Sequence, residues 1–321
     1  MALIQKLKAA LAEQSCSSNT VKTYCWWIRR FYSFTKKPGS QWQPDDVRNY
    51  MLLLHADRYS AKSRKQALCA IKFVFDHVLK LDMGQLDLPP MPYEKRGLRI
   101  IPTRAEIGRI FAGMSGQCRL VAGLLYGAGL RVEECCKLRV KDIDFETMTV
   151  RIHGGKGDKD RLCLLPQRIV PALQRQIAWR AALHERDLAE GAGFVELPGR
   201  LAVKYPAAPR ELRWQFLFPS AVIREQRRWY VTPQAVQKAM KIAVNSAGIL
   251  KRVTPHTLRH AFCTHAMRAG NDPATVQELM GHESLETTML YAHGDHARGV
   301  SPMDAPDIIP ARMPSHHALA F

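Results

Sequence analysis

The sequence has few cysteines, few acidic residues and no long apolar run, and each shortage excludes a class of protein. The longest apolar run, residues 120–130, is about half of the roughly 20 residues that a helix needs to cross a bilayer, so we expect no transmembrane helix. Lys6 and Lys8 lie where a signal peptide would have its apolar stretch, which predicts a cytoplasmic protein. The 321 residues suffice for two domains or three small ones.

The cysteines are too sparse for a disulfide scaffold. The chain has eight of them, and none forms the C-x-x-C spacing of a zinc ribbon. Cys135 and Cys136 are adjacent and cannot easily bridge each other. We therefore expect free thiols throughout, as in a reducing compartment.

The 29 acidic residues are outnumbered by 47 basic ones, which gives a formal net charge of +18. This excess favours a polyanionic partner, either nucleic acid or an acidic membrane surface, although it also fits a basic protein kept soluble by its surface. Residues 1–93 carry a net +7 and residues 94–321 a net +11, which favours two domains that grip one nucleic acid. No basic amphipathic helix with a clean apolar face stands out to support a membrane partner.

Apolar residues recur at helical spacing in the N-terminal quarter of the chain and predict four helices, which begin near residues 3, 18, 44 and 60. Residues 83–104 break this pattern, because prolines alternate there with basic residues, as is typical of an extended linker. We expect a helical domain at residues 1–83, a basic linker at 84–102, a second domain at 103–295 and a tail at 296–321.

The second domain is predicted to be helical with one small antiparallel sheet. Thr103 and Glu106 have the spacing of a capping box at its first helix. Alternating apolar residues predict three short strands, and a glycine-rich turn at residues 154–158 separates the last two. The strands are expected at 140–145, 147–152 and 161–165, and later helices at 170–189, from 232, at 254–268, 273–281 and 284–291. Residues 191–230, with four prolines, are predicted to be irregular.

Several residues of this domain suit phosphate chemistry, although each alone also fits a structural role. Arg131 begins a helix, with Glu134 one turn later, and Lys156 lies in the glycine-rich turn. His256 and Arg259 are three residues apart, so they share a helix face.

Three histidines on one predicted helix raise the alternative of a metal site. The zinc-protease pattern requires Glu directly after the first His, but Thr257 follows His256 here. We therefore expect no metal and no other cofactor. Gly281-His282 and, nine residues later, Tyr291 complete the set of candidate residues.

The order of these residues resembles the signature of the tyrosine site-specific recombinases over residues 103–295. The matching positions are Arg131, Lys156, His256-x-x-Arg259, Gly-His282 and Tyr291. The resemblance implies a mainly α protein, in which an N-terminal helical bundle (the core-binding domain) and an α+β catalytic domain form a clamp on DNA.

The resemblance also implies a role for each residue, without a cofactor. Tyr291 attacks a backbone phosphorus and forms a 3′-phosphotyrosine, while Arg131 and Arg259 bind the non-bridging oxygens. Lys156 protonates the leaving 5′-oxygen and His256 exchanges the proton of the tyrosine. His282 hydrogen-bonds a phosphate oxygen, and Glu134 orients either Arg131 or the adjacent helix.

A second resemblance concerns residues 191–230, which are similar to the extra insertion of integron integrases. The similarity rests on Leu197-Pro198, Lys204-Tyr205-Pro206 and the run from Arg213 to Ser220. It implies folded single-stranded cassette sites and duplex attachment sites as substrates, and a homotetramer on the DNA. Aromatic residues would stack on extrahelical bases of the hairpin.

Trp214 is the first candidate for this stacking, with Trp229, Tyr230 and Arg228 behind it. The run Arg227-Arg228-Trp229-Tyr230 departs from that subfamily, which tends to carry His-His after the arginines. The alternative for Trp214 is that it packs the insertion onto the domain, together with Phe216 and Phe218.

Three other functions remain open at this stage. A recombinase of the phage or chromosome-dimer type would act on duplex DNA only, and a type IB topoisomerase would share the chemistry. A catalytically inactive DNA-binding factor would bind DNA tightly without forming a covalent adduct.

Overall fold

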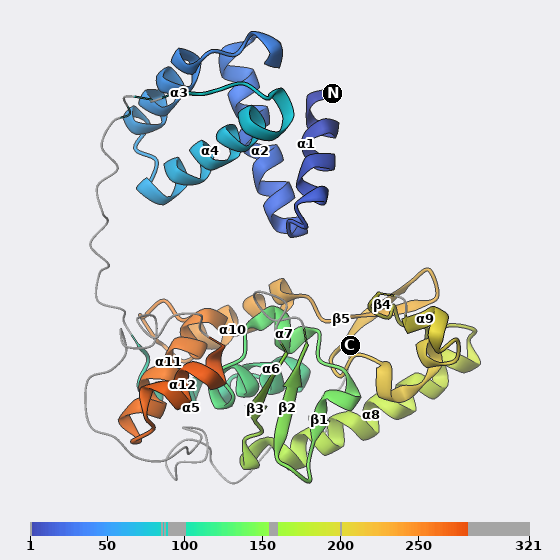
Figure 1. Ribbon diagram of the computed structural model, residues 1–321. Coiled ribbons are helices and arrows are strands. Elements are labelled where there is room, and N and C mark those ends of the chain that lie inside the picture. Colours follow the sequence, from blue (N-terminus) through green and yellow to red (C-terminus); the bar gives the residue numbers. More distant parts are fainter. Residues whose placement is uncertain are drawn as a thin grey trace. The chain divides into compact units, whose positions relative to one another are not determined.

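The computed structural model of the chain describes residues 2–84, 86, 88, 101–153, 160–199 and 201–281. The chain divides into two compact units, residues 1–98 and 99–321 (Figure 1). Among the described residues, no helix combines the length and the apolar character needed to span a bilayer.

The N-terminal unit is a helical bundle, as predicted. Its helices are α1 (Ala2–Glu13), α2 (Ser18–Thr35), α3 (Pro44–Ala56) and α4 (Ala61–Phe73), followed by a π-helical turn, Val74–Leu79. Ser60 caps α4, and Ser17 caps α2 through its hydroxyl, which accepts from the Thr20 N–H. Phe31, Trp42 and Tyr50 pack in the centre of this bundle.

The second unit begins with α5 (Arg104–Ala112), α6 (Gly116–Gly127) and α7 (Val132–Cys136). Thr103 and Glu106 form the predicted capping box on α5. The sheet that follows has the antiparallel order β1 (Ile143–Asp144), β2 (Thr149–Ile152), β3 (Arg161–Leu164). The first strand is shorter than predicted, because Val140–Asp142 forms a 3-10 turn.

The rest of this unit consists of helices and one further hairpin. The elements are α8 (Val170–Ala189), α9 (Leu201–Lys204), β4 (Pro219–Arg224), β5 (Arg227–Tyr230), α10 (Pro233–Ser246), α11 (Pro255–Arg268) and α12 (Pro273–Met280). The β4–β5 hairpin corrects the prediction that residues 191–230 are irregular. Pro219 is the first residue of a strand in a two-stranded sheet, a position at which proline is tolerated.

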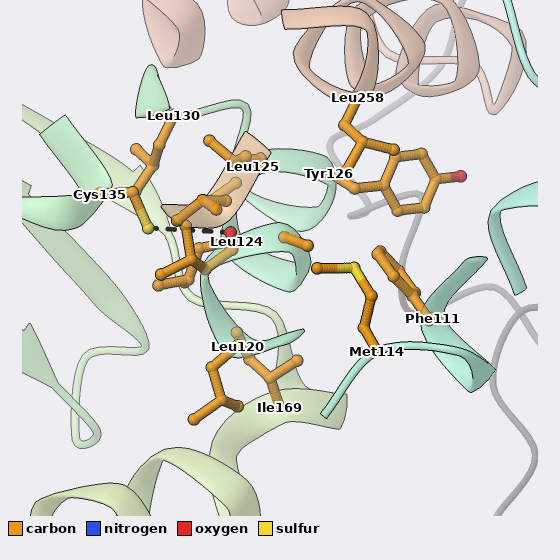
Figure 2. Close-up of a cluster of buried hydrophobic side chains, with 14 of the residues drawn as sticks. Phe111, Met114, Leu120, Leu124, Leu125, Tyr126, Leu130, Cys135, Ile169 and Leu258 are labelled. Atoms are coloured by element: carbon orange, nitrogen blue, oxygen red, sulfur yellow. Dashed lines mark hydrogen bonds between the residues drawn. The ribbon is translucent and has the colours of Figure 1, made fainter. Parts of the chain in front are cut away.

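The core of the second unit surrounds α6, the segment that forms the longest apolar run of the sequence. Figure 2 shows Leu124, Leu125 and Tyr126 of this helix packed with Phe111 and Leu258 from neighbouring segments. The buried Cys135 Sγ–H donates to the carbonyl oxygen of Val121 at 3.8 Å. All eight cysteines are free.

Candidate active site

Two arginines from different parts of the chain meet at the C-terminal end of α12. Arg131 immediately precedes α7, and its Nη2 donates to the carbonyl oxygen of Gly281 at 3.1 Å. Arg259 lies on α11, and its Nη2 donates to the carbonyl oxygen of Met280 at 2.5 Å. The end of a helix leaves such carbonyl groups without intrahelical partners. The last turn of α12 therefore holds both predicted phosphate-binding arginines.

Strand β3 reaches the same helix end. The Cys163 Sγ–H donates to the carbonyl oxygen of Leu279 at 3.3 Å. Gly281 follows in the left-handed conformation, with φ of 59°, which is the usual way for a helix to end. The consecutive main-chain carbonyls of Leu279 and Met280, which end α12, and of its C-cap Gly281 are thus bound by side chains from β3, α11 and the N-terminal end of α7.

Glu134 binds both the side chain of Arg131 and the backbone at the start of α7. One carboxylate oxygen accepts from Arg131 Nη1 at 2.7 Å, and the other accepts from the Arg131 backbone N–H at 2.8 Å. Burial opposes the ionisation of Glu134. Hydrogen bonds from Arg161 and from the Arg131 backbone outweigh this effect and lower the pKa of Glu134 to about 2. The carboxylate is therefore charged at any physiological pH.

Arg161, at the start of β3, is the site residue that sequence reasoning missed. Its guanidinium donates to both oxygens of Glu134, at 2.9 and 2.7 Å. A basic residue three positions after the glycine-rich turn, at the start of the predicted strand, was the available signal. Its partner is 27 positions away in the sequence, so the pairing could not be read from local spacing.

Arg259 is almost completely buried and lies in a positively charged region. Burial, together with the neighbouring charges of Arg131 and Arg161, lowers its pKa to about 9, although the charge of Glu134 opposes the shift. Arg131 and Arg161 share the carboxylate of Glu134, and Arg259 lies close enough to be influenced by the charges of all three groups. Such a region attracts a bound anion, and guanidinium groups are well shaped to bind phosphate oxygens.

A substitution at Gly129 tests how tightly the residues around Arg259 are packed. Its φ is 66°, and an added Cβ would lie 2.6 Å from the ring of Phe262. Its carbonyl oxygen also accepts a hydrogen bond from Arg259 Nη1. We expect Gly129→Ala to lower the free energy of unfolding by about 2–5 kcal/mol, from left-handed strain and overpacking together, measured by urea denaturation.

The matched control is Gly248→Ala. Gly248 has a similar φ of 63° but nothing within 4 Å of an added Cβ. Only the backbone penalty, about 1–2 kcal/mol, then applies. Equal losses in the two variants would show that the contact with Phe262 does not limit this position.

The structure places His256 on the first turn of α11, exposed at the surface. Its ring makes an edge contact with His260, with 4.1 Å between ring centroids. Within the described segments, no group of three or more His, Cys, Asp or Glu side chains has an arrangement that could hold a metal. Lys156, His282 and Tyr291 lie outside the described residues, and so do the predicted helix at 284–291 and the tail at 296–321.

The insertion lies at the C-terminal end of α8, away from α11 and α12 (Figure 1). Its own small core consists of Val195, Leu197, Ala208 and Phe216, with Trp214 and Tyr230 packed against it. The insertion also lines a cavity of about 330 Å³ between residues 194–197 and the β4–β5 turn. This segment therefore forms a module with a small core of its own, which is joined to the main core of the second unit through Leu217 and Phe218.

Trp214 is half-buried at the edge of this module. The ammonium of Lys141 lies 3.6 Å from the centroid of its ring, a cation–π contact. Arg139 Nη1 donates to the Trp214 carbonyl oxygen at 2.6 Å and Arg139 Nη2 to that of Glu196 at 2.8 Å. Sequence reasoning missed both basic residues, which attach the module to the segment before β1.

Arg228 was predicted to contact DNA, but its side chain is buried and paired within the protein. Its side chain is 8% exposed and forms a bidentate ion pair with Asp187 of α8, at 2.6 and 2.5 Å. Its Nη1 donates to the carbonyl oxygens of Ser220 and Ala221. The geometry favours a role for Arg228 in holding the β4–β5 hairpin to α8 over a contact with DNA.

The two aromatic residues that follow Arg228 are half-buried. Tyr230 packs edge-on against Phe216, with 5.0 Å between ring centroids, and Lys137 lies 5.9 Å from the Tyr230 ring. Trp229 and Tyr230 end the β5 strand. Their predicted stacking on DNA bases stays a prediction.

Known proteins similar to this chain agree with one another. Residues 103–298 match the phage integrase family, and residues 3–85 match the phage integrase N-terminal SAM-like domain. An integrase/recombinase of Escherichia coli is 36% identical over 317 residues, which cover 94% of this chain and 93% of the relative. The tyrosine recombinase XerA of Thermococcus onnurineus is 29% identical and covers 90% of this chain and 89% of its own.

Two solved structures share the fold. The Tn1549 transposon integrase in complex with transposon right end DNA has a TM-score of 0.64 at 19% identity, over 91% of this chain and 95% of that one. The XerH site-specific recombinase bound to palindromic difH substrate has a TM-score of 0.61 at 18% identity, over 88% and 79%.

The fold and the matches over both units define a DNA-recombining enzyme that cuts and rejoins strands. The chain belongs to the phage integrase family and is a tyrosine recombinase.

Proposed function

We propose that this tyrosine recombinase is an integron integrase, which inserts and excises gene cassettes at folded single-stranded and duplex attachment sites. The observation that carries the proposal is the insertion module, with its own core, its cavity and its aromatic edge. A cavity of that size with apolar and polar lining suits a planar base that has left the helix stack.

The proposed chemistry begins at the two arginines. One guanidinium nitrogen of each is bonded to α12, and donors that remain bind the non-bridging oxygens of the scissile phosphate. They stabilise the charge that develops on these oxygens in the transition state. Because two fixed cations supply this stabilisation, the reaction does not depend on a metal ion.

The remaining steps of the proposal transfer the phosphoryl group from the 5′-oxygen to the tyrosine and move two protons. The Tyr291 oxygen forms a bond to phosphorus while the bond from phosphorus to the 5′-oxygen breaks, which leaves a 3′-phosphotyrosine. His256 accepts the tyrosine proton and Lys156 gives a proton to the 5′-oxygen, while His282 hydrogen-bonds a phosphate oxygen. Rejoining reverses these steps, so the energy of the phosphodiester is kept.

The proposed assembly uses both units of the chain. The linker at 84–102 joins the helical unit, residues 1–83, to the catalytic unit, residues 103–295. Both units are basic, and they bind the same DNA. Strand exchange joins two sites, so four protomers form a homotetramer on DNA in the bacterial cytoplasm.

A covalent-adduct assay tests the proposal. The purified enzyme is incubated with a nicked cassette-site hairpin and, separately, with the matching duplex, and adducts are resolved on a denaturing gel. We expect more adduct on the hairpin. Adduct on the duplex alone would contradict the integron assignment and support a duplex-only recombinase.

Trp214 variants sharpen the same assay. Trp214→Leu keeps apolar packing but removes the ring, so we expect hairpin affinity to fall by about 5–150-fold, the equivalent of one lost base stack of 1–3 kcal/mol. Affinity for the duplex should change less than about twofold, and Trp214→Phe should retain most hairpin binding. Equal losses on both substrates would overturn the stacking role.

One observation favours the duplex-only alternative. Lys141 already covers one face of the Trp214 ring, and the ring also packs against the module core. On this alternative, Trp214 is a structural residue, and the leucine variant lowers thermal stability without changing substrate preference.

A further inference from the structure

Arg161 is outside the set of residues that the family resemblance supplied, yet it is bound to the centre of the site. Its side chain is 11% exposed, and both of its terminal nitrogens donate to Glu134. Burying a guanidinium is costly unless it is paired. The pairing with Glu134 is therefore the feature that keeps Arg161 in this place.

Glu134 divides its carboxylate between two arginines. One oxygen accepts from Arg131 Nη1 and Arg161 Nη1, and the other accepts from the Arg131 backbone N–H and Arg161 Nη2. These four bonds use all the acceptor directions of a carboxylate. One negative charge is thus shared by two positive charges, and a net positive charge remains for a phosphate.

Arg161 also lies against the second anchor of Arg131. A Cβ on Gly281 would meet Arg161 Cδ at 3.0 Å and Nε at 3.1 Å. The carbonyl oxygen of this same glycine accepts the hydrogen bond from Arg131 Nη2. Arg161 therefore bonds one of the two groups that fix the Arg131 guanidinium, Glu134, and lies beside the other, Gly281.

We propose that Arg161 is a positioning residue for Arg131: it shares Glu134, so that Arg131 stays aimed and keeps its charge for the scissile phosphate. The inference rests on the phosphate-binding role of Arg131 in the proposed function. Without Arg161, Glu134 pairs with Arg131 alone and cancels its charge. Arg161 itself need not touch the DNA.

The first test is single-turnover cleavage by Arg161→Ala. We expect a loss of about 10–100-fold, smaller than the 10²–10³ typical of a donor that touches the transition state. A methylphosphonate at the scissile position lacks the negative charge of the phosphate. On this substrate, the loss of cleavage rate in Arg161→Ala should shrink to less than about threefold, because the transition state needs less positive charge. Arg175→Ala is the control, since it removes an exposed arginine of α8.

The second test is the double variant Arg161→Ala/Glu134→Gln. A glutamine cannot cancel the charge of Arg131, so we expect the second substitution to restore at least about tenfold of the lost cleavage. A purely structural role predicts the opposite, a further loss. If Arg161→Ala does not fold, Arg161→Gln replaces it in both tests, because glutamine removes the positive charge but keeps an N–H donor for Glu134.

The outcomes separate the two ideas. If Arg131→Ala cleaves like the unchanged enzyme, the proposed function of Arg131 fails. Arg131→Ala could be inactive while Arg161→Ala loses the same factor in cleavage rate on the phosphate and the methylphosphonate DNA. If Glu134→Gln also fails to restore cleavage, only the inference about Arg161 is overturned.

Discussion

Tyr291→Phe is expected to abolish DNA cleavage while leaving DNA binding unchanged. The substitution removes only the phenolic oxygen, which we propose forms the bond to phosphorus. Loss of the nucleophile in other covalent enzymes costs roughly 10⁶-fold in rate. The measurement is covalent adduct on a denaturing gel with a nicked substrate, beside equilibrium binding to the same DNA.

The matched control for this experiment is Tyr205→Phe, which removes the same atom from an exposed tyrosine of the insertion. It should form adduct at the normal rate. Adduct formation by Tyr291→Phe would mean that another residue is the nucleophile. Loss of both binding and adduct would mean that Tyr291 is needed to hold the DNA.

Asp187→Ala is expected to destabilise the catalytic unit by about 3–5 kcal/mol, the usual result of removing one partner of a buried ion pair. Asp187 is 1% exposed and is paired with Arg228 at 2.5 Å, and Arg180 Nη1 lies 3.9 Å away. The substitution leaves two buried guanidinium groups without a counter-charge. In a unit of this size, thermal unfolding should occur about 6–20 °C lower.

Differential scanning calorimetry measures this effect, and limited proteolysis locates it. The first cleavage should move to the insertion, because Arg228 then no longer ties the β4–β5 hairpin to α8. The control Glu185→Ala removes an exposed carboxylate of the same helix and should change stability by less than about 0.5 kcal/mol. A similar small change in Asp187→Ala would show that the insertion does not depend on this ion pair.

Local patterns predicted most of the helices and two of the sheet strands well. Thr103 with Glu106, Ser60 and Pro44 mark helix starts in the sequence and in the structure. These signals work because capping depends on residues three or four positions apart. The β4–β5 hairpin was missed, since a run rich in proline and charge resembles a loop when its partners are unknown.

In the site, too, the sequence predicted residues with a local pattern but not the contacts between residues that are distant in the sequence. The convergence of Arg131 and Arg259 agrees with the resemblance, but the groups that hold them, Gly281 and Met280, are main-chain carbonyls and carry no residue-type signal. Arg228 was predicted to face DNA. Its burial against Asp187, 41 positions away, depends on how the hairpin folds onto α8.

The binding of the arginines to main-chain atoms has a consequence for sequence divergence. A substitution at Leu279 or Met280 changes a side chain but keeps the carbonyl that Cys163 or Arg259 binds. A single-residue insertion or deletion within α12 instead rotates the following carbonyls by about 100° and shifts them by about 1.5 Å. Length, more than residue identity, is therefore the conserved quantity to look for in this helix among active relatives.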